Sequence, residues 1–216
     1  MIEQKQHIIK ASYNQFRQLG FKNVTMDDLA RQIGISKKTL YEQFENKDAL
    51  VLESVKYMLE TNRSETDAAL KSSKNAIEQL INVITIMEKM LRGLNMVSYM
   101  DLQRYYPAAY QYLETFKREH MLTDIIENLK QGIAEGLYRS DVNVEVVSRF
   151  RLESGMIVFH NNVYPQDKFN IIEVNNELFV HYMYGIATIK GHKMINKYLN
   201  KETEKCYIPN LFKVKC

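Results

Sequence analysis

The stretch TMDDLARQIGISKKTLYEQFENK, residues 25–47, constrains the fold more than any other part of the chain. Thr25 is a predicted helix N-cap, and Asp28 three residues later completes an approximate capping box. Apolar residues follow at helical spacing up to Ile33, and Gly34 suits the left-handed backbone at a helix C-terminus. Ser36 is a second predicted N-cap. The pattern therefore predicts two short helices joined by a tight turn.

The second of these helices, over 37–44, has two different faces. Leu40, Tyr41 and Phe44 lie three and four residues apart, so we expect them to pack on the first helix. The other face carries Lys37, Lys38, Thr39, Glu42 and Gln43. This is the spacing of a helix-turn-helix, whose second helix enters the major groove of DNA. The stretch alone also fits two amphipathic helices joined by a glycine turn in any helical protein.

Composition narrows the class of protein without identifying it. The 216 residues include only 3 Pro and 8 Gly, which is typical of a largely helical chain, and the net charge of +3 is too mild to identify a nucleic-acid binder. We expect no membrane span or signal peptide, and hence a cytoplasmic protein. The two cysteines, Cys206 and Cys216, indicate neither a disulfide framework nor a zinc site.

The remainder of the chain predicts an all-α fold of about nine helices, without strands. After the helix-turn-helix we expect a long helix capped by Asn46, then helices over 75–92, 95–104, 107–133, 144–163 and 171–189, the last extended after a break at Gly191. A further helix over 3–19 precedes the helix-turn-helix. The predicted domains are an N-terminal domain over 1–46, a helical domain over 47–202 and a tail over 203–216.

One helix, a helix-turn-helix with GISKKTLYEQFENK at 34–47 and a long helical body together resemble the TetR family of bacterial transcriptional regulators. The motif is specific over about the first fifty residues, and beyond them the resemblance is architectural. It implies a larger domain for ligand binding and dimerisation, which the fourth helix joins to the DNA-binding domain. It also implies a regulator, most readily a repressor, that binds a palindromic operator in double-stranded DNA as a homodimer and is released by a small effector.

The helix-turn-helix supplies the predicted DNA contacts. Helix N-termini hold phosphates, lysines reach phosphates or guanine edges, and a threonine methyl packs on thymine. By resemblance, the tyrosine contacts the DNA backbone, and a small residue often stands where this chain has Lys38. Each lysine is otherwise an ordinary solvated charge. The predicted DNA-binding residues are Thr25, Ser36, Lys37, Lys38, Thr39, Tyr41 and Lys47.

The last two long helices are the predicted dimer interface. They carry apolar residues on more than one face, which indicates burial on two sides. The alternative is that both helices serve only the core of one chain. The predicted interface residues are Phe150, Ile157, Phe159, Phe179, Tyr182, Met183 and Ile186.

Residues 87–121 form the predicted ligand site because they combine five methionines with six aromatic residues. Adaptable thioethers and amphipathic tyrosine rings suit a flat, apolar or cationic small molecule. Ordinary helical core is the alternative for each residue. The predicted ligand-binding residues are Met87, Met90, Met96, Tyr99, Met100, Tyr106, Tyr110 and Phe116.

No catalytic constellation, phosphate loop or cofactor motif is recognisable, so we expect neither an enzyme nor a cofactor. Glu177 and His181 have a weak metal-ligand spacing but no third ligand, and we predict no metal site. Two alternatives to an effector-controlled regulator stay open. One is a member of the same family that is controlled by a protein partner or has no small-molecule effector. The other, less favoured, is a helical enzyme or ligand carrier.

Overall fold

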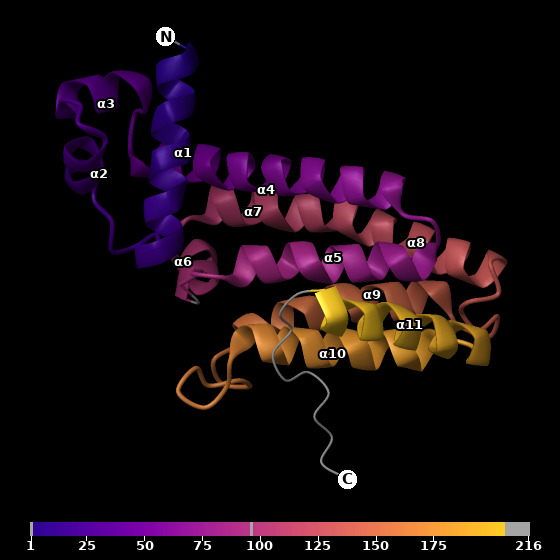
Figure 1. Ribbon diagram of the computed structural model, residues 1–216. Coiled ribbons are helices and arrows are strands. Elements are labelled where there is room, and N and C mark those ends of the chain that lie inside the picture. Colours follow the sequence, from indigo (N-terminus) through magenta and orange to yellow (C-terminus); the bar gives the residue numbers. More distant parts are fainter. Residues whose placement is uncertain (1, 96, 206–216) are drawn as a thin grey trace. The chain divides into compact units, whose positions relative to one another are not determined.

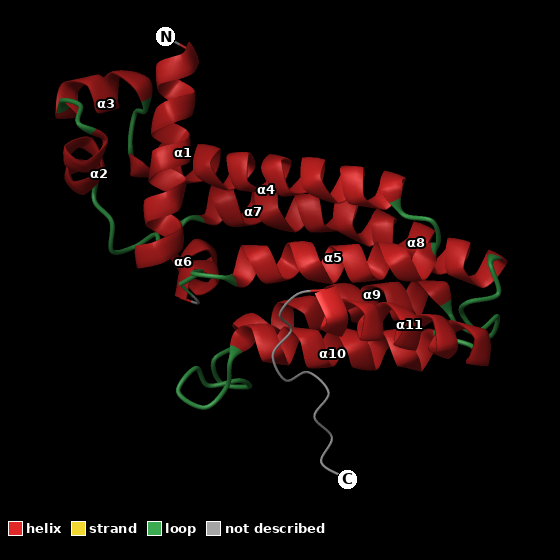
Figure 2. Cartoon of the chain, viewed as in Figure 1, coloured by secondary structure: helices red, strands yellow, loops and turns green. Residues whose placement is uncertain are grey.

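The computed structural model describes residues 2–95 and 97–205. Within these ranges every regular element is a helix, and one isolated bridge pairs Tyr138 with Ala187 (Figures 1 and 2). The predicted all-α class is therefore confirmed. The chain divides into two compact units: unit 1 comprises Met1–Glu65 and Arg92–Arg118, and unit 2 comprises Thr66–Leu91 and Glu119–Cys216.

Unit 1 packs the N-terminal helices with a later pair of short helices. It contains α1 (Ile2–Leu19), α2 (Met26–Ile33), α3 (Lys37–Gln43), the first part of α4 (Lys47–Ser72), α6 (Val97–Tyr105) and α7 (Pro107–Phe116). Phe16, Leu29, Leu40 and Leu50 are completely buried in its core, together with Leu102 from α6. Long-range packing thus adds residues 92–118 to the helix-turn-helix and the helices that flank it.

The predicted helix ends of this unit are confirmed. Thr25 accepts from the Asp28 N–H at 3.1 Å in a complete capping box, and Gly34 adopts φ 76° at the end of α2. Ser36 caps α3, and Asn46 accepts from the Ala49 N–H at 2.9 Å at the start of α4. Each cap satisfies main-chain groups that a helix terminus leaves without partners.

One aromatic residue of α3 differs from the prediction. Tyr41 is 50% exposed, so the expected packing of its ring on α2 is wrong. Leu40 and Phe44, which are 0% and 3% exposed, fill the contact, and a residue next to Leu40 is rotated by about 100° away from it.

Asn95 and residues 97–106 cover the C-terminal end of α1 and the start of the loop after it, where carbonyl groups need donors from outside the helix. The bonds run from Asn95 N–H to the Arg17 carbonyl at 2.8 Å, from Ser98 Oγ to the Phe16 carbonyl at 3.3 Å, and from Tyr106 OH to the Phe21 carbonyl at 3.2 Å. The α6 segment therefore fixes the point at which the chain leaves α1 for α2.

Unit 2 is a second helical bundle. It contains the end of α4, α5 (Ala76–Leu91), α8 (Leu122–Ala134), α9 (Val144–Met156), α10 (Ile171–Ile186) and α11 (Ile189–Lys205). Its core includes Ile77, Leu129, Phe179 and Met183. A π-helical turn, Lys117–Met121, separates α7 from α8, so the predicted continuous helix over 107–133 is interrupted there. The long helix α4 continues to Ser72.

Two later helix ends also differ from the prediction. Helix α9 ends at Met156 rather than near residue 163, and a 3₁₀ turn, Ile157–Phe159, follows it. The break in the last helical region lies at Ala187, not at Gly191, because Thr188 donates its N–H to the Leu137 carbonyl at 2.9 Å. Gly191 lies inside α11, where a Cβ atom would be 2.2 Å from the Leu137 oxygen. This glycine permits a close approach of two chain segments.

A buried polar network joins α5 to α8 in unit 2. The Ala76 carbonyl accepts from Asn128 Nδ2 at 2.8 Å and from Tyr138 OH at 3.1 Å. The Tyr138 ring passes directly over Gly132, where a Cβ would lie 2.0 Å from a ring carbon. Burial raises the pKa of Tyr138, so the hydroxyl remains a donor at neutral pH.

The compact units are defined by packing alone, and the domain limits expected at 46 and 202 stay predictions. Most of the expected tail, residues 206–216, lies outside the described part of the chain, as do Met96 and both cysteines. No helix among the described residues is long and apolar enough to cross a membrane. These described residues also contain no group of three or more His, Cys, Asp or Glu suited to a metal ion.

Candidate nucleic-acid interface

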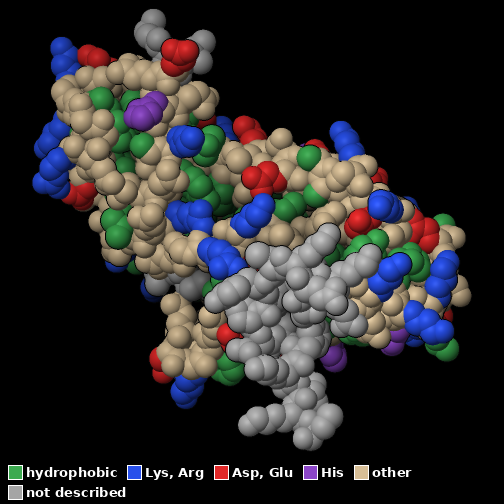
Figure 3. All heavy atoms as spheres, in the orientation of Figure 1, with side chains coloured by type: hydrophobic (Ala, Val, Ile, Leu, Met, Phe, Trp, Pro, Cys, Tyr) green, Lys and Arg blue, Asp and Glu red, His purple; other side chains and the backbone are tan. Residues whose placement is uncertain are grey.

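Helix α3 presents a cationic outer surface because only one of its faces is needed for packing. Leu40 is buried in the core of unit 1, whereas Lys37, Lys38 and Tyr41 are exposed. Figure 3 shows Lys and Arg side chains gathered at the edge of the molecule over α2 and α3, with acidic side chains among them. Lys37 and Lys38 therefore face outward, away from the packed side of α3, as predicted.

Each of these lysines has a carboxylate close by. Lys37 Nζ forms an ion pair with Asp27 of α2, and Lys38 Nζ lies 3.9 Å from Glu42 Oε1 on α3. All four side chains are more than half exposed. Exposed pairs of this kind are weak, about 0–1 kcal/mol, because water and salt screen them. The cations can therefore exchange a carboxylate for a phosphate at small cost.

The three predicted hydroxyl residues stabilise helix N-termini. Thr25 Oγ1 donates to Asp28 Oδ2 at 2.6 Å, and Ser36 Oγ and Thr39 Oγ1 lie 2.8 Å apart. The hydrogen bonds from Thr25 lower the pKa of the Asp28 carboxyl, aided by Arg31. The caps also accept from the Asp28 and Thr39 N–H groups and so stabilise the starts of α2 and α3, the helix ends at which anions are favoured.

Lys47 differs from the lysines of α3. It begins α4, donates to the Lys22 carbonyl at 3.1 Å and lies 5.6 Å from the centre of the Tyr106 ring. Burial lowers its pKa, although Asp101 and Asp48 oppose the change. Lys47 thus ties the start of α4 to the loop between α1 and α2, and only part of its side chain is accessible to a partner.

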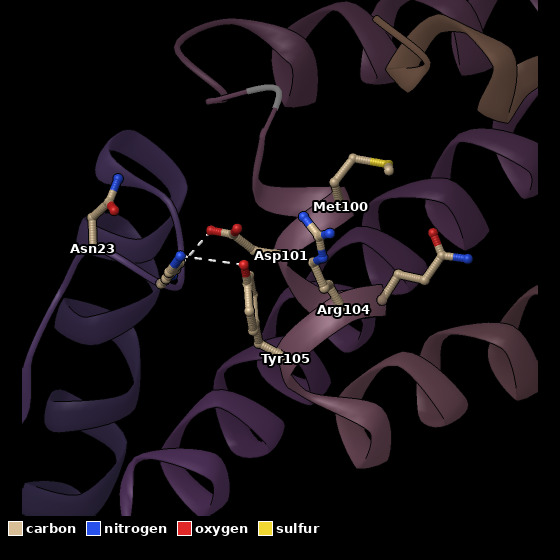
Figure 4. A pocket seen from close by; sticks show the side chains of 7 residues that line it. Asn23, Met100, Asp101, Arg104 and Tyr105 are labelled. Atoms are coloured by element: carbon tan, nitrogen blue, oxygen red, sulfur yellow. Dashed lines mark hydrogen bonds between the residues drawn. The ribbon is translucent and has the colours of Figure 1, made fainter. Parts of the chain in front are cut away.

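An open cavity of about 590 Å³ lies beside that loop, and it was not predicted from the sequence. Lys22 and Asn23 line it from the loop, and α6 contributes Met100, Asp101, Gln103, Arg104 and Tyr105 (Figure 4). The Lys22 N–H donates to Asp101 Oδ2 at 3.0 Å, and its ammonium donates to Tyr105 OH at 3.2 Å. These partners are about 80 residues apart in the chain, so no local pattern indicates the contact.

The predicted ligand-binding residues are not one cluster within either unit. Met87 and Met90 belong to α5 in unit 2, whereas Tyr99, Met100, Tyr106, Tyr110 and Phe116 belong to unit 1. Tyr106 is 6% exposed in the core, and burial, aided by Asp48 and Asp101, raises its pKa to about 12. Tyr99 and Tyr110 contact each other edge to face, with ring centres 6.1 Å apart. Tyr106 is thus part of the helical core, the alternative to a ligand contact.

Four of the predicted dimer residues need correction. Phe179, Tyr182, Met183 and Ile186 are at most 5% exposed because they form the core of unit 2 within one chain. Ile157 and Phe159 are partly buried. Phe150, by contrast, is 62% exposed on α9, one turn after Val146 at 60%. Of the predicted set, Phe150 offers the largest free apolar surface for a partner.

Comparisons with known proteins agree with this arrangement. Residues 8–54 match the model for bacterial regulatory proteins of the tetR family. The chain is 31% identical over 113 residues to YvaF, a helix-turn-helix transcriptional regulator of Bacillus subtilis, covering 52% of this chain and 59% of that relative. It is 25% identical over 152 residues to the transcriptional repressor KstR2 of Mycolicibacterium smegmatis, covering 68% and 73%.

Among solved structures, a transcriptional regulator from Saccharomonospora viridis in complex with choline superposes with a TM-score of 0.72. The superposition covers 87% of this chain and 100% of that one, at 16% identity, and therefore shows a shared fold. The family match covers all of α2 and α3 and the caps that shape them. Residues 8–54 thus match the helix-turn-helix of the tetR family of bacterial regulatory proteins, and the chain shares its helical fold with a solved transcriptional regulator.

Proposed function

We propose that the chain is a DNA-binding transcriptional regulator, most readily a repressor, whose helix α3 reads the major groove. The observation that carries this proposal is the exposed cationic face of α3 beside two capped helix N-termini. Lys37 and Lys38 contact phosphates or guanine edges, and Thr39 and Tyr41 add contacts to a base and to the DNA backbone. Such a regulator acts where bacterial DNA lies, in the cytoplasm.

A homodimer on a palindromic operator is part of the proposal. One seven-residue helix contacts only a few base pairs, and two copies related by a two-fold axis read two half-sites. Among the described residues, the exposed apolar pair Val146 and Phe150 on α9 supports an interface at that helix. An exposed apolar surface of this kind commonly marks contact with another protein.

We also propose that a small effector with an apolar body binds the region beyond the helix-turn-helix and lowers the affinity for DNA. The Saccharomonospora viridis relative holds choline in the same fold, which supports a small-molecule site. A hundredfold preference of the effector for the DNA-incompetent state corresponds to about 2.7 kcal/mol per site. Control by a protein partner is the alternative, and retained DNA binding without any ligand-induced thermal shift across a broad panel would favour it.

The test of DNA binding measures affinity for an operator selected from a random double-stranded library, at several salt concentrations. We expect Lys37→Ala combined with Lys38→Ala to weaken binding and to reduce the slope of log K against log salt. Removing two lysine–phosphate interactions per protomer reduces that slope by about 1.8, or about 3.6 for a dimer. Unchanged affinity and slope would contradict the assignment of α3.

The matched control is Lys71→Ala combined with Lys74→Ala, which removes the same charge from exposed positions of unit 2. We expect this control to leave the salt slope close to that of the wild-type protein. A similar effect of both double variants would mean that net charge, rather than the surface of α3, determines binding.

A further inference from the structure

Arg151 of α9 carries a buried positive charge inside unit 2. The residue is 8% exposed, and its guanidinium carbon lies 4.2 Å from the centre of the Phe179 ring and 5.5 Å from that of Tyr182. Its Nη2 atom is 3.8 Å from the sulfur of Met87. These contacts come from α5 and α10, which pack with α9 in this unit (Figure 1). No carboxylate or other oxygen acceptor among the described residues bonds to this guanidinium.

The guanidinium of Arg151 lacks the oppositely charged partner that buried charges normally have. Buried arginines are usually paired, and a guanidinium has five N–H donors that a sulfur atom and two ring faces do not satisfy. Burial lowers the pKa of Arg151 to about 10, so the side chain still carries its charge at neutral pH. Within the described part of unit 2, the positive charge of Arg151 therefore has no anionic partner.

Tyr182 supplies a second, independent sign of a missing partner. Its side chain is 5% exposed, and its hydroxyl oxygen is buried without a hydrogen-bond partner. Burial raises the pKa of Tyr182 to about 12, opposed by Arg151, so the hydroxyl keeps its proton and acts as a donor. A buried hydroxyl without a partner is costly and uncommon in folded proteins. The ring of the same tyrosine contacts Arg151, which places both unsatisfied donors in one neighbourhood.

The guanidinium lies against the backbone of Gly155, which has no side chain to offer it. Gly155 follows Arg151 by one helical turn, and a Cβ atom there would lie 3.1 Å from Arg151 Nη1. The surrounding groups that contact the guanidinium are a thioether and aromatic rings, which favour an apolar neighbour. The chemistry required is thus one negative charge with two acceptor oxygens on an apolar body.

We propose that unit 2 binds a monocarboxylate with an apolar body, whose carboxylate accepts from the guanidinium of Arg151 and the hydroxyl of Tyr182. The planar fork of arginine matches the two oxygens of a carboxylate. A single buried cation neutralises one negative charge, whereas a phosphate monoester carries nearly two at neutral pH. This inference rests on the proposed effector function, whose ligand class it names. The sequence led us to expect an apolar or cationic molecule, and the proposed ligand is instead an anion with an apolar body.

The experiment measures, by calorimetry, the affinity of the purified protein for dodecanoate and for 1-dodecanol. The alcohol has the same hydrocarbon chain without the charge. We expect the wild-type protein to bind the acid at least about 30-fold more tightly than Arg151→Met does, the loss typical of a broken buried charge pair. Affinity for the alcohol should differ less than about threefold between the two proteins. Octanoate and hexadecanoate, each with its matching alcohol, extend the series to shorter and longer chains. Tyr182→Phe should weaken binding of the acid and leave that of the alcohol unchanged.

Arg149→Met is the matched control, because Arg149 is exposed on the same helix and its guanidinium pairs with Glu145. We expect this control to bind the acid as the wild-type protein does. Without ligand, Arg151→Met should unfold at the same temperature as the wild-type protein or at a higher one, because it removes an unpaired buried charge. Dodecanoate should then stabilise the wild-type protein and not this variant.

Equal binding of the acid and the alcohol by the wild-type protein, or no binding of any acid in the series, would overturn the proposal. Loss of the fold in Arg151→Met would also overturn it, by showing that the charge is satisfied within the chain. The operator assay separates this inference from the proposed function. Acid binding without DNA binding refutes the regulator and leaves the site, whereas DNA binding without acid binding refutes the site alone.

Discussion

Replacing Asp101 by alanine tests whether α6 holds the loop before the helix-turn-helix. Asp101 is 4% exposed, and its Oδ2 accepts from the Lys22 N–H at 3.0 Å. The carboxylate also attracts the ammonium of Lys47. A hydrogen bond to a charged group contributes about 1.5–3 kcal/mol, and the alanine leaves the Lys22 N–H without its acceptor. We therefore expect Asp101→Ala to lower the free energy of unfolding by that amount.

The assay is urea unfolding of the full chain, together with its midpoint of thermal unfolding. For a protein of this size, 1 kcal/mol lowers the melting temperature by about 2–4 °C, so the alanine variant should melt about 3–12 °C lower. Asp101→Asn keeps an acceptor oxygen without the charge, and we expect it to cost about 0.5–1.5 kcal/mol. Operator affinity, measured where all variants are folded, should fall in the same order because the loop leads directly to Thr25.

Asp141→Ala is the control, because Asp141 pairs with Arg139 at 3.2 Å on an exposed surface. Its removal should change stability by less than about 1 kcal/mol. If Asp101→Ala were as stable as this control and bound the operator normally, the bond from Lys22 would be incidental. The reasoning that α6 positions the helix-turn-helix would then be refuted.

Three further perturbations have defined outcomes. Gly132→Ala would place a Cβ 2.0 Å from the Tyr138 ring, so thermal unfolding should show a loss of about 3 kcal/mol or no folded protein, and wild-type stability would contradict the close contact. Thr25→Ala should cost about 1 kcal/mol in urea unfolding through loss of the cap. Because Thr25 holds the pKa of Asp28 below its ordinary 3.8, the stability from this carboxylate is full above pH 3.8 and is lost as pH falls through the lower folded pKa. The variant should lack that part of the acid dependence, and an identical pH profile would argue against it. Phe150→Asp should dissociate the proposed dimer in sedimentation equilibrium, and an undisturbed dimer would exclude α9 from its centre.

The helix-turn-helix was predictable because its signals are local. Thr25, Gly34 and Ser36 each act on main-chain groups within four residues, and the structure places all three as expected. A helix cap depends on few neighbours, so its residue type indicates its position directly. The exposed side of α3 followed from the same logic, once Leu40 was assigned to the core.

The break in the last helical region was not predictable, because its cause is distant in the chain. Gly191 has the residue type of a helix end, yet the chain breaks at Ala187, where the backbone pairs with Leu137 and Arg139. The glycine serves a close approach of α11 to that same segment. A local pattern identifies a residue with special backbone freedom, but only tertiary contacts show whether that freedom serves a turn or a contact.

The same limit explains the residues expected at the dimer and ligand sites. Apolar periodicity shows that a helix buries a face, but not whether the face meets another helix of the same chain or a second chain. Met183 and Phe150 are both large apolar residues of predicted helices, yet Met183 is completely buried and Phe150 is 62% exposed. Methionines and tyrosines concentrated over 87–121 likewise divide between two units because the chain crosses from one to the other there.

Arg151 shows what a local pattern omits and a structure supplies. In the sequence it lies next to Arg149 and Phe150 within RFRLES, where a second arginine indicates only another surface charge. Helical geometry separates the two arginines by about 200°, so Arg149 faces outward to Glu145 while Arg151 lies against Phe179 and Met87. The two arginines therefore look equivalent in the sequence, and only the structure shows that one of them is buried. That charge, rather than the aromatic content of the chain, is the stronger guide to the chemistry of the effector, because a buried cation without an anion restricts its partner far more than an apolar surface does.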